Sequence, residues 1–92
     1  MIRVAISGAG GKLASPIAEA IAASDDLELT ALYNPNRAGA EMHGVTVTAA
    51  PSEVDADVVV ETAHPDVVLD NLKAWREKGV AAVVGTSGFT PE

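Results

Sequence analysis

Hydrophobic positions follow two different periods in the first part of the chain. The β-branched run from Ile2 to Ile6 predicts a strand buried on both faces, as in a parallel sheet. Apolar residues then recur every fourth position at Leu13, Ile17 and Ile21, which predicts a helix with one buried face. Leu27 to Tyr33 resumes a strand pattern. The chain is therefore expected to begin with strand, helix and strand.

The middle of the chain is less regular. Asn34 to Gly39 has the composition of a loop, and the alternation from Val45 to Thr48 predicts a short strand near a sheet edge. Pro51 to Val54 is expected to form one helical turn. Ala56 to Glu61 contains three consecutive valines and predicts a third clear strand, again buried.

A second helix is expected to begin near Pro65, because proline suits the first turn of a helix. Its buried stripe is predicted at Val68, Leu72 and Trp75, and Val80 to Val84 should follow as a fourth buried strand. Strands alternating with helices predict an α/β, Rossmann-like parallel sheet of about four strands with flanking helices. The last three residues, Thr-Pro-Glu, have the pattern of a helix start, so residues 1–92 are expected to form only part of a dinucleotide-binding domain, incomplete at its C-terminal end.

A glycine cluster lies between the first strand and the first helix. Gly8 ends the strand, Gly11 falls where a Cβ would block a close phosphate, and Ala14 falls where small size allows the helix to approach the sheet. The amide groups at a helix N-terminus suit a phosphate, so this turn is predicted to hold a pyrophosphate. The predicted contacts are Gly8, Ala9, Gly10, Gly11, Lys12 and Leu13. The alternative is a strand–helix turn that binds nothing.

The loop after the second strand begins roughly 20 residues beyond the glycine turn, where this fold contacts the adenosine ribose. An acidic residue there would favour a free 2′-hydroxyl, but the chain has Asn34, with Arg37 close behind. Asn34 can bond a ribose hydroxyl without repelling a 2′-phosphate, and Arg37 could pair with that phosphate. The alternative is a turn-forming asparagine beside a surface arginine.

Composition narrows the possible partners. The formal net charge is −7 without any basic run, which argues against nucleic acid or an anionic membrane as a partner. The chain has no cysteine and no apolar run approaching the roughly 20 residues of a membrane span, so a cytoplasmic protein is expected. No spacing typical of metal ligands or of a nucleophile with its base is present. His43 and His64 are not expected to be catalytic.

Three stretches resemble a known family, that of dihydrodipicolinate reductase (4-hydroxy-tetrahydrodipicolinate reductase). Val4 to Leu13 looks like the family's N-terminal glycine turn, and Asp57 to Pro65 resembles its D-F-T-x-P stretch. Val83 to Phe89 resembles its specific V-x-G-T-T-G-F motif. Order and spacing agree along all 92 residues.

The resemblance implies a reductase of the diaminopimelate and lysine pathway that uses NADPH or NADH to reduce the cyclic product of dihydrodipicolinate synthase. It implies that residues 8–13 hold the pyrophosphate and that Asn34 lies near the adenosine ribose. It places Gly85, Thr86 and Ser87 near the nicotinamide ribose and ring, and Ala63 near the cofactor. Asn34 departs from the family's acidic residue, and Thr62 and Ala63 depart from its Phe and Thr.

The family's catalytic His-His…Lys segment and Ser-Gly-Thr run belong to a second domain, and neither motif is found in this sequence. The chain alone is therefore expected to be inactive, to meet a small-molecule substrate only with that domain, and to belong to a homotetramer in its full-length form. Two other readings stay open. The chain could be a stand-alone NAD(P)-binding or regulatory module without catalysis, or a non-binding α/β partner subunit.

Overall fold

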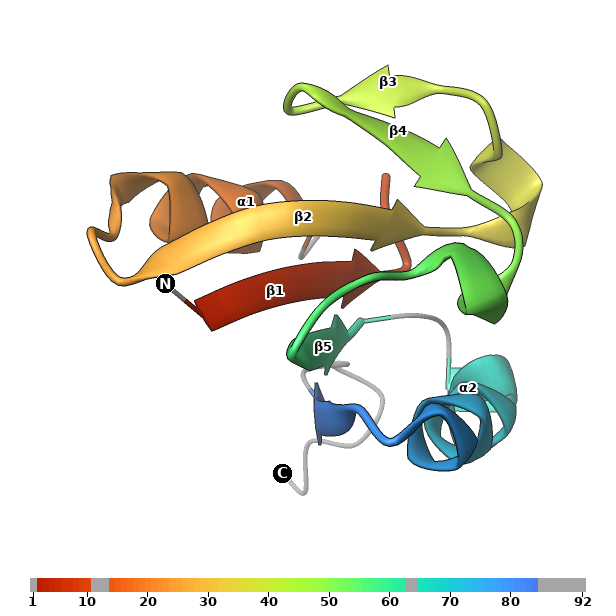
Figure 1. The fold of residues 1–92 in the computed structure, drawn as a ribbon. Helices are drawn as coiled ribbons and strands as arrows, with labels where there is room; N and C mark the ends of the chain where they lie inside the picture. The colour runs from red at the N-terminus through yellow and green to blue at the C-terminus, as the bar shows by residue number, and fades with distance from the viewer. Residues whose placement is uncertain (1, 11–13, 63–64, 85–92) are drawn as a thin grey trace, which may run out of the picture.

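The strands of the described residues form one sheet of six strands, in the order β3-β4-β2-β1-β5-β6. Figure 1 shows how the sheet and helices are arranged. The computed structural model describes residues 2–10, 14–62 and 65–84. Its elements, in chain order, are β1 (Ile2–Ser7), α1 (Ala14–Ala23), β2 (Leu27–Tyr33), η1 (Pro35–Arg37), β3 (Glu41–Met42), β4 (Val45–Thr48), η2 (Pro51–Glu53), β5 (Val58–Glu61), α2 (Pro65–Lys78) and β6 (Ala81–Val84). The α/β fold with a parallel central sheet is as predicted.

The two helices cover opposite faces of the sheet (Figure 1). Val4 and Ile6 of β1 share a buried cluster with Ile21 of α1, whereas Ala5 between them shares a cluster with Trp75 of α2. Successive side chains of a strand point to opposite faces, so a strand between two helices needs apolar residues at every position. This explains why the buried centre of β1, from Val4 to Ile6, is apolar at every position.

The chain connections create a crevice at one edge of the sheet. From β1 the chain passes through α1 to β2 on one side, and it later returns to pair β5 with the other side of β1. The helices that follow β1 and β5 therefore leave the sheet toward opposite faces. In open parallel sheets, ligands bind outside the carboxyl ends of the strands at such a point.

The sheet has two strands more than the four clearly predicted. The extended segment Val45–Thr48 joins it as β4, parallel to β2, and Glu41–Met42 pairs with β4 as the antiparallel β3. His43 and Gly44 link the two strands with φ angles of 54° and 79°. A two-residue hairpin turn with both φ angles positive matches the twist of the strands it connects. A two-residue strand carries no period of its own, which is why β3 was not predicted.

The prediction that the last strand is buried is wrong. β6 pairs with β5 at the edge of the sheet, and all four of its residues are exposed. Val83 and Val84 are 57% and 41% exposed. Within the described part of the chain, α2 is the helix that packs against β6, and the strand's outer edge has no neighbour. An apolar pattern predicts a strand, but it does not say whether that strand lies in the centre of the sheet or at its edge.

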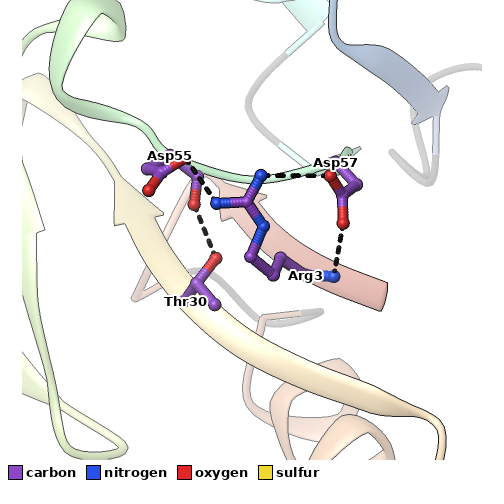
Figure 2. A network of polar contacts seen from close by, with 4 residues as sticks. All are labelled: Arg3, Thr30, Asp55 and Asp57. Atoms are coloured by element: carbon purple, nitrogen blue, oxygen red, sulfur yellow. Dashed lines mark hydrogen bonds and ion pairs between the residues drawn. The ribbon is translucent and has the colours of Figure 1, made fainter. Parts of the chain in front are cut away.

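On the amino-terminal side of the sheet, charged and polar groups connect β1 and β2 to the segment that leads into β5 (Figure 2). The Arg3 guanidinium donates to Asp55 at 2.7 Å and to Asp57 at 3.1 Å, and the Arg3 amide donates to the Asp57 carboxylate at 3.0 Å. Thr30 is the extra residue of β2 where its register with β1 shifts, and its hydroxyl donates to the Asp55 carbonyl at 2.7 Å. This network ties the beginning of β1 to the chain entering β5.

Candidate functional site

A cleft of about 560 Å³ opens at the carboxyl ends of β1, β2 and β5. Its size lies within the range of small-molecule sites. The floor comes from the turn after β1 and from the end of β5, one wall from the segment after β2, and the other wall from α2. The described lining residues are Ser7, Gly8, Gly10, Tyr33, Asn34, Pro35, Asn36, Arg37, Thr62, Val67, Asp70 and Asn71.

The first part of the glycine turn is held by the end of β2. The amides of Gly8 and Ala9 both donate to the Tyr33 carbonyl, at 2.8 and 3.3 Å. Gly10 has a φ of 92°, and a Cβ there would lie 2.5 Å from both Cδ and Nε of Arg37. Gly10 is therefore needed both for its backbone conformation and for the approach of the arginine.

The wall after β2 is built around the side chain of Asn34. Its Nδ2 donates to the Ala9 carbonyl at 2.7 Å, and its Oδ1 accepts from the Asn36 amide at 3.0 Å. Asn34 thus caps η1 and fastens it to the glycine turn. One Nδ2 hydrogen and one Oδ1 lone pair are left for a ligand. The sequence left open whether Asn34 forms a turn or bonds a ribose, and in the structure Asn34 has the turn-forming role.

A buried polar network lies beneath the floor. Glu61, at the end of β5, is fully buried, and its Oε2 accepts from Ser7 Oγ at 3.0 Å and from Asn71 Nδ2 at 3.1 Å. Its Oε1 accepts from Trp75 Nε1 at 2.8 Å. Ser7 and Glu61 stand opposite each other in the parallel register of β1 and β5, while Asn71 and Trp75 lie one turn apart on α2. A buried carboxyl group is tolerated because it is surrounded by donors.

Tyr33 connects this network to the wall after β2. Its ring meets that of Trp75 edge to face, with centroids 5.2 Å apart and an interplanar angle of 86°. Burial, and after it the nearby Glu61 carboxylate, raises the pKa of the Tyr33 phenol. The phenol is therefore neutral at ordinary pH and acts in this site as a packing group.

The structure brings together four of the predicted site residues. Gly8, Gly10, Asn34 and Arg37 all line the cleft. Ala9 is instead buried in the core beside α1, and it contributes its carbonyl to Asn34. Seven other predicted residues lie outside the described residues, namely Gly11, Lys12, Leu13, Ala63, Gly85, Thr86 and Ser87. The cofactor contacts of all twelve stay predictions.

His43, the histidine that lies within the described residues, is not part of the cleft. His43 is exposed in the turn between β3 and β4, as expected of a solvated side chain, and His64 lies outside the described residues. Among residues 2–10, 14–62 and 65–84, no group of three or more His, Asp or Glu side chains is arranged to hold a metal ion. In the same residues, no helix has the length and hydropathy to cross a membrane.

From the sequence, neither Ser7 nor Asn71 was assigned a role in the site, and the α2 wall was not predicted. Ser7 and Asn71 line the cleft and are both hydrogen-bonded to Glu61. The one feature of the sequence that could have indicated this network is Glu61 itself, a charged residue at the end of an otherwise apolar strand. Thr62 donates to the Ser7 carbonyl through both its amide, at 2.8 Å, and its hydroxyl, at 2.7 Å. None of these pairings is local, so no spacing in the sequence could have indicated them.

The walls of the cleft differ in charge. Arg37 supplies a cation and five N–H donors on the η1 side, whereas Asp70 supplies carboxylate acceptors on the α2 side. Val67, 44% exposed, adds an apolar contact beside Asp70. The arrangement suits a ligand with an anionic group at one side and an apolar body with hydrogen-bond donors at the other. A phosphorylated nucleoside has both features.

Comparisons with known proteins agree with this description. The family described as "Dihydrodipicolinate reductase, N-terminus" matches residues 2–92. A 4-hydroxy-tetrahydrodipicolinate reductase of Nocardia farcinica is 43% identical over 88 residues, covering 96% of this chain and 32% of the relative. One from Streptococcus uberis is 37% identical over 92 residues, covering 97% of this chain and 36% of the relative. The chain thus spans about a third of the length of these relatives.

Two solved structures share the fold. The dipicolinate-bound dihydrodipicolinate reductase from Paenisporosarcina sp. TG-14 matches with a TM-score of 0.79 at 24% identity, covering 99% of this chain and 39% of that one. Aspartate semialdehyde dehydrogenase with NADP from Candida albicans matches with a TM-score of 0.83 at 21% identity, covering 100% of this chain and 31% of that one. At these identities the likeness concerns the fold alone.

The family match over residues 2–92 and the named relatives confirm the resemblance read from the glycine turn and the V-x-G-T-S-G-F stretch. The parallel sheet, with a cleft at its carboxyl edge, is the architecture expected of that family's cofactor-binding part. The chain belongs to the N-terminal family of dihydrodipicolinate reductase, the part of this oxidoreductase that binds NADPH or NADH.

Proposed function

We propose that the cleft binds the adenosine half of NADPH or NADH, between the glycine turn and η1. The observation that carries this proposal is the meeting of Gly8, Gly10, Asn34 and Arg37 around one cavity of about 560 Å³ at the carboxyl edge of the sheet. The amides of Gly8 and Ala9 already donate to the Tyr33 carbonyl. The pyrophosphate is therefore proposed to be bound by Gly10 and by the predicted contacts Gly11, Lys12 and Leu13. The proposed nicotinamide contacts are Gly85, Thr86 and Ser87, and Ala63 is proposed as a further contact with the cofactor.

The cofactor would supply a hydride, and the residues of this chain would hold and orient the cofactor. We propose that the whole protein reduces the cyclic product of dihydrodipicolinate synthase, in keeping with the names of its relatives. The relative solved with dipicolinate supports a cyclic dicarboxylate as the class of substrate. Substrate capture and proton transfer belong to the part of the protein beyond this chain, and so does assembly into a homotetramer. A cytoplasmic location completes the proposal.

The first experiment is a calorimetric titration of the chain with NADPH and with NADH. Saturable binding of either cofactor at a stoichiometry near one supports the proposal. If neither cofactor gives heat on titration or protects the chain from thermal unfolding, the proposal is wrong and the alternative of a non-binding α/β subunit remains. Binding without any partner domain is expected to be weak, because only part of the cofactor is enclosed.

Arg37 provides a test of the cofactor's orientation. We expect Arg37→Glu to weaken NADPH by about tenfold or more and NADH by much less, because a possible partner of the 2′-phosphate becomes a like charge. Calorimetry on both cofactors measures the two losses. Arg76→Glu, the same change at an exposed position near the end of α2, is the matched control and should leave both affinities unchanged. Equal losses for the two cofactors with Arg37→Glu would make Arg37 a bystander.

A further inference from the structure

Asn71, on the α2 wall of the cleft, is hydrogen-bonded to the polar network beneath the floor. Asn71 is half-buried and lines the cleft, and its Nδ2 donates to Glu61 Oε2 at 3.1 Å and to Ser7 Oγ at 3.4 Å. The two acceptors lie on the same side of this nitrogen, because Ser7 Oγ and Glu61 Oε2 are themselves 3.0 Å apart, so the nitrogen end of the amide is held by the network beneath the floor. The other end of the amide, Oδ1, is then the end left for the cleft.

The buried carboxyl group of Glu61 is what prevents the opposite orientation. Turning the Asn71 amide over would set its oxygen against the Glu61 Oε2 that now accepts at 3.1 Å, and would remove a donor from a fully buried group. Such a group loses free energy when its hydrogen bond is not made. Glu61 is itself held by Trp75 Nε1 at 2.8 Å and by Ser7 Oγ at 3.0 Å.

We propose that Asn71 is a ligand-contacting residue whose Oδ1 accepts a hydrogen bond from a neutral donor of the bound nucleoside, and that Glu61 is the positioning residue that keeps this acceptor facing the cleft. This inference rests on the proposed cofactor site. Two groups of the adenosine half have the required chemistry, the exocyclic amine of adenine and a ribose hydroxyl. Val67 and Asp70 on the same wall offer an apolar contact and further acceptors.

Glu61→Gln is the sharpest variant, because it keeps the shape and changes the hydrogen bonding. The new Oε1 accepts from Trp75 Nε1 as before, and the new Nε2 donates toward Ser7 and Asn71, in place of the acceptor Oε2. Asn71 then turns over and presents Nδ2 to the cleft. Asn71→Ala removes the cleft-facing group altogether. Glu77→Gln, the same change on an exposed part of α2, is the matched control.

Orientation is read first, without any cofactor, from the side-chain NH₂ signals in NMR spectra. The chain has three asparagines and no glutamine, so three pairs of signals are expected. In the wild type, the Asn71 hydrogens should exchange with solvent more slowly than those of the exposed Asn36. Glu61→Gln should abolish that difference, whereas Glu77→Gln should preserve it. Equal exchange of Asn71 and Asn36 in the wild type would overturn the positioning role of Glu61.

Ligand contact is read by calorimetry with NADPH and its deamino analogue, which carries hypoxanthine in place of adenine. If the donor is the adenine amine, the wild type should prefer NADPH by about three- to tenfold, the value of one neutral hydrogen bond. Glu61→Gln and Asn71→Ala should both remove this preference. If the donor is a ribose hydroxyl, both ligands should bind the wild type equally, and Asn71→Ala should weaken both about threefold or more.

Wild-type affinities for both ligands in Asn71→Ala would overturn the ligand contact. A wild type that binds neither NADPH nor NADH would refute the proposed function and the ligand contact with it, while the NMR comparison would still decide whether Glu61 orients Asn71. Circular dichroism of each variant verifies that the fold is retained. Loss of folding in Glu61→Gln alone leaves Asn71→Ala to decide the contact and the wild-type exchange rates to decide the orientation.

Discussion

β1 is tied to β5 at both of its ends, but by opposite kinds of chemistry. At the carboxyl end, Ser7 donates to Glu61 inside a fully buried network, and at the amino end Arg3 pairs with Asp57 at the surface. Both pairs join residues 54 positions apart. The exposed network in Figure 2 pairs one arginine with two carboxylates, whereas in the buried one a carboxyl group accepts from the neutral donors of Ser7, Asn71 and Trp75.

The difference teaches which kind of polar contact controls the site. At the surface, water competes for every charge, so ion pairs there contribute little to stability. In the interior no water replaces a lost partner, and each buried donor or acceptor must be satisfied. The cleft is built on the interior network, so its geometry should depend on Glu61 far more than on Arg3. Four predictions test this contrast, in order of decreasing effect.

The largest effect is expected from Glu61→Ala. Removing the carboxyl group leaves buried donors on Ser7 and Trp75 without their acceptor and opens a cavity, which should lower the free energy of unfolding by about 3 kcal/mol or more. Urea unfolding followed by the fluorescence of Trp75, the sole tryptophan, measures the loss. Asp55→Ala at the exposed end is the control. If Glu61→Ala and Asp55→Ala lower the free energy of unfolding by similar amounts, the proposed difference between the buried and exposed networks is wrong.

A smaller effect is expected from Trp75→Phe. This change keeps an aromatic ring against Tyr33 but removes the Nε1 donor to Glu61, so the free energy of unfolding should fall by about 1–2 kcal/mol. Urea unfolding followed by circular dichroism is the measurement, because the fluorophore is lost. Unchanged stability would mean that the remaining donors around Glu61 suffice.

A still smaller effect is expected from Arg3→Met. The change removes both ion pairs of the amino-terminal edge while keeping an apolar stem, so the midpoint of thermal unfolding should fall less than in Trp75→Phe. The difference from the wild type should shrink further in high salt, which screens exposed charges. A loss that is larger than that of Trp75→Phe, or is insensitive to salt, would mean that the surface network matters more than its exposure indicates.

The smallest effect concerns pH. The Arg3 amide, and next its guanidinium, hold the pKa of the Asp57 carboxyl below its ordinary value of 3.8. A carboxyl group with a lowered folded-state pKa contributes stability that is present above its unfolded-state pKa and is lost as the pH falls through the folded-state value. Urea midpoints should therefore fall below about pH 4, and less steeply in Asp57→Asn. Between pH 6 and 8 the two proteins should show the same pH dependence.

Most of the fold could be predicted because its determinants are local or periodic. The strand pattern from Leu27 to Tyr33 matches β2 at both ends, and the predicted stripe of α2 is confirmed by Val68 and Trp75, both fully buried. Glycine and proline marked the turns because their backbone preferences act within a few residues. β3 could not be predicted, because two residues pair only once β4 is in place.

The candidate site was predictable in part for the same reason. Gly8 and Asn34 directly follow strands, Gly10 and Arg37 come within the next few residues, and parallel strands bring their carboxyl ends to one edge. Ser7, Thr62 and Asn71 reach that edge through contacts with partners that are distant in sequence, from Ser7–Asn71 at 64 positions to Glu61–Asn71 at 10. Their roles depend on the register of β1 with β5 and on the rotation of α2.

The sequence by itself determined the order of strands and helices, the glycine turn at the first carboxyl end and the family to which the chain belongs, because periodicity and turn chemistry are properties of neighbouring residues. Only the tertiary structure decided that the described part of β6 is an exposed edge, that Asn34 fastens one wall of the cleft to its floor, and that Glu61 is buried beneath that floor. Each of these depends on which groups meet across the sheet and which lose their water, and both are settled only when distant segments pack.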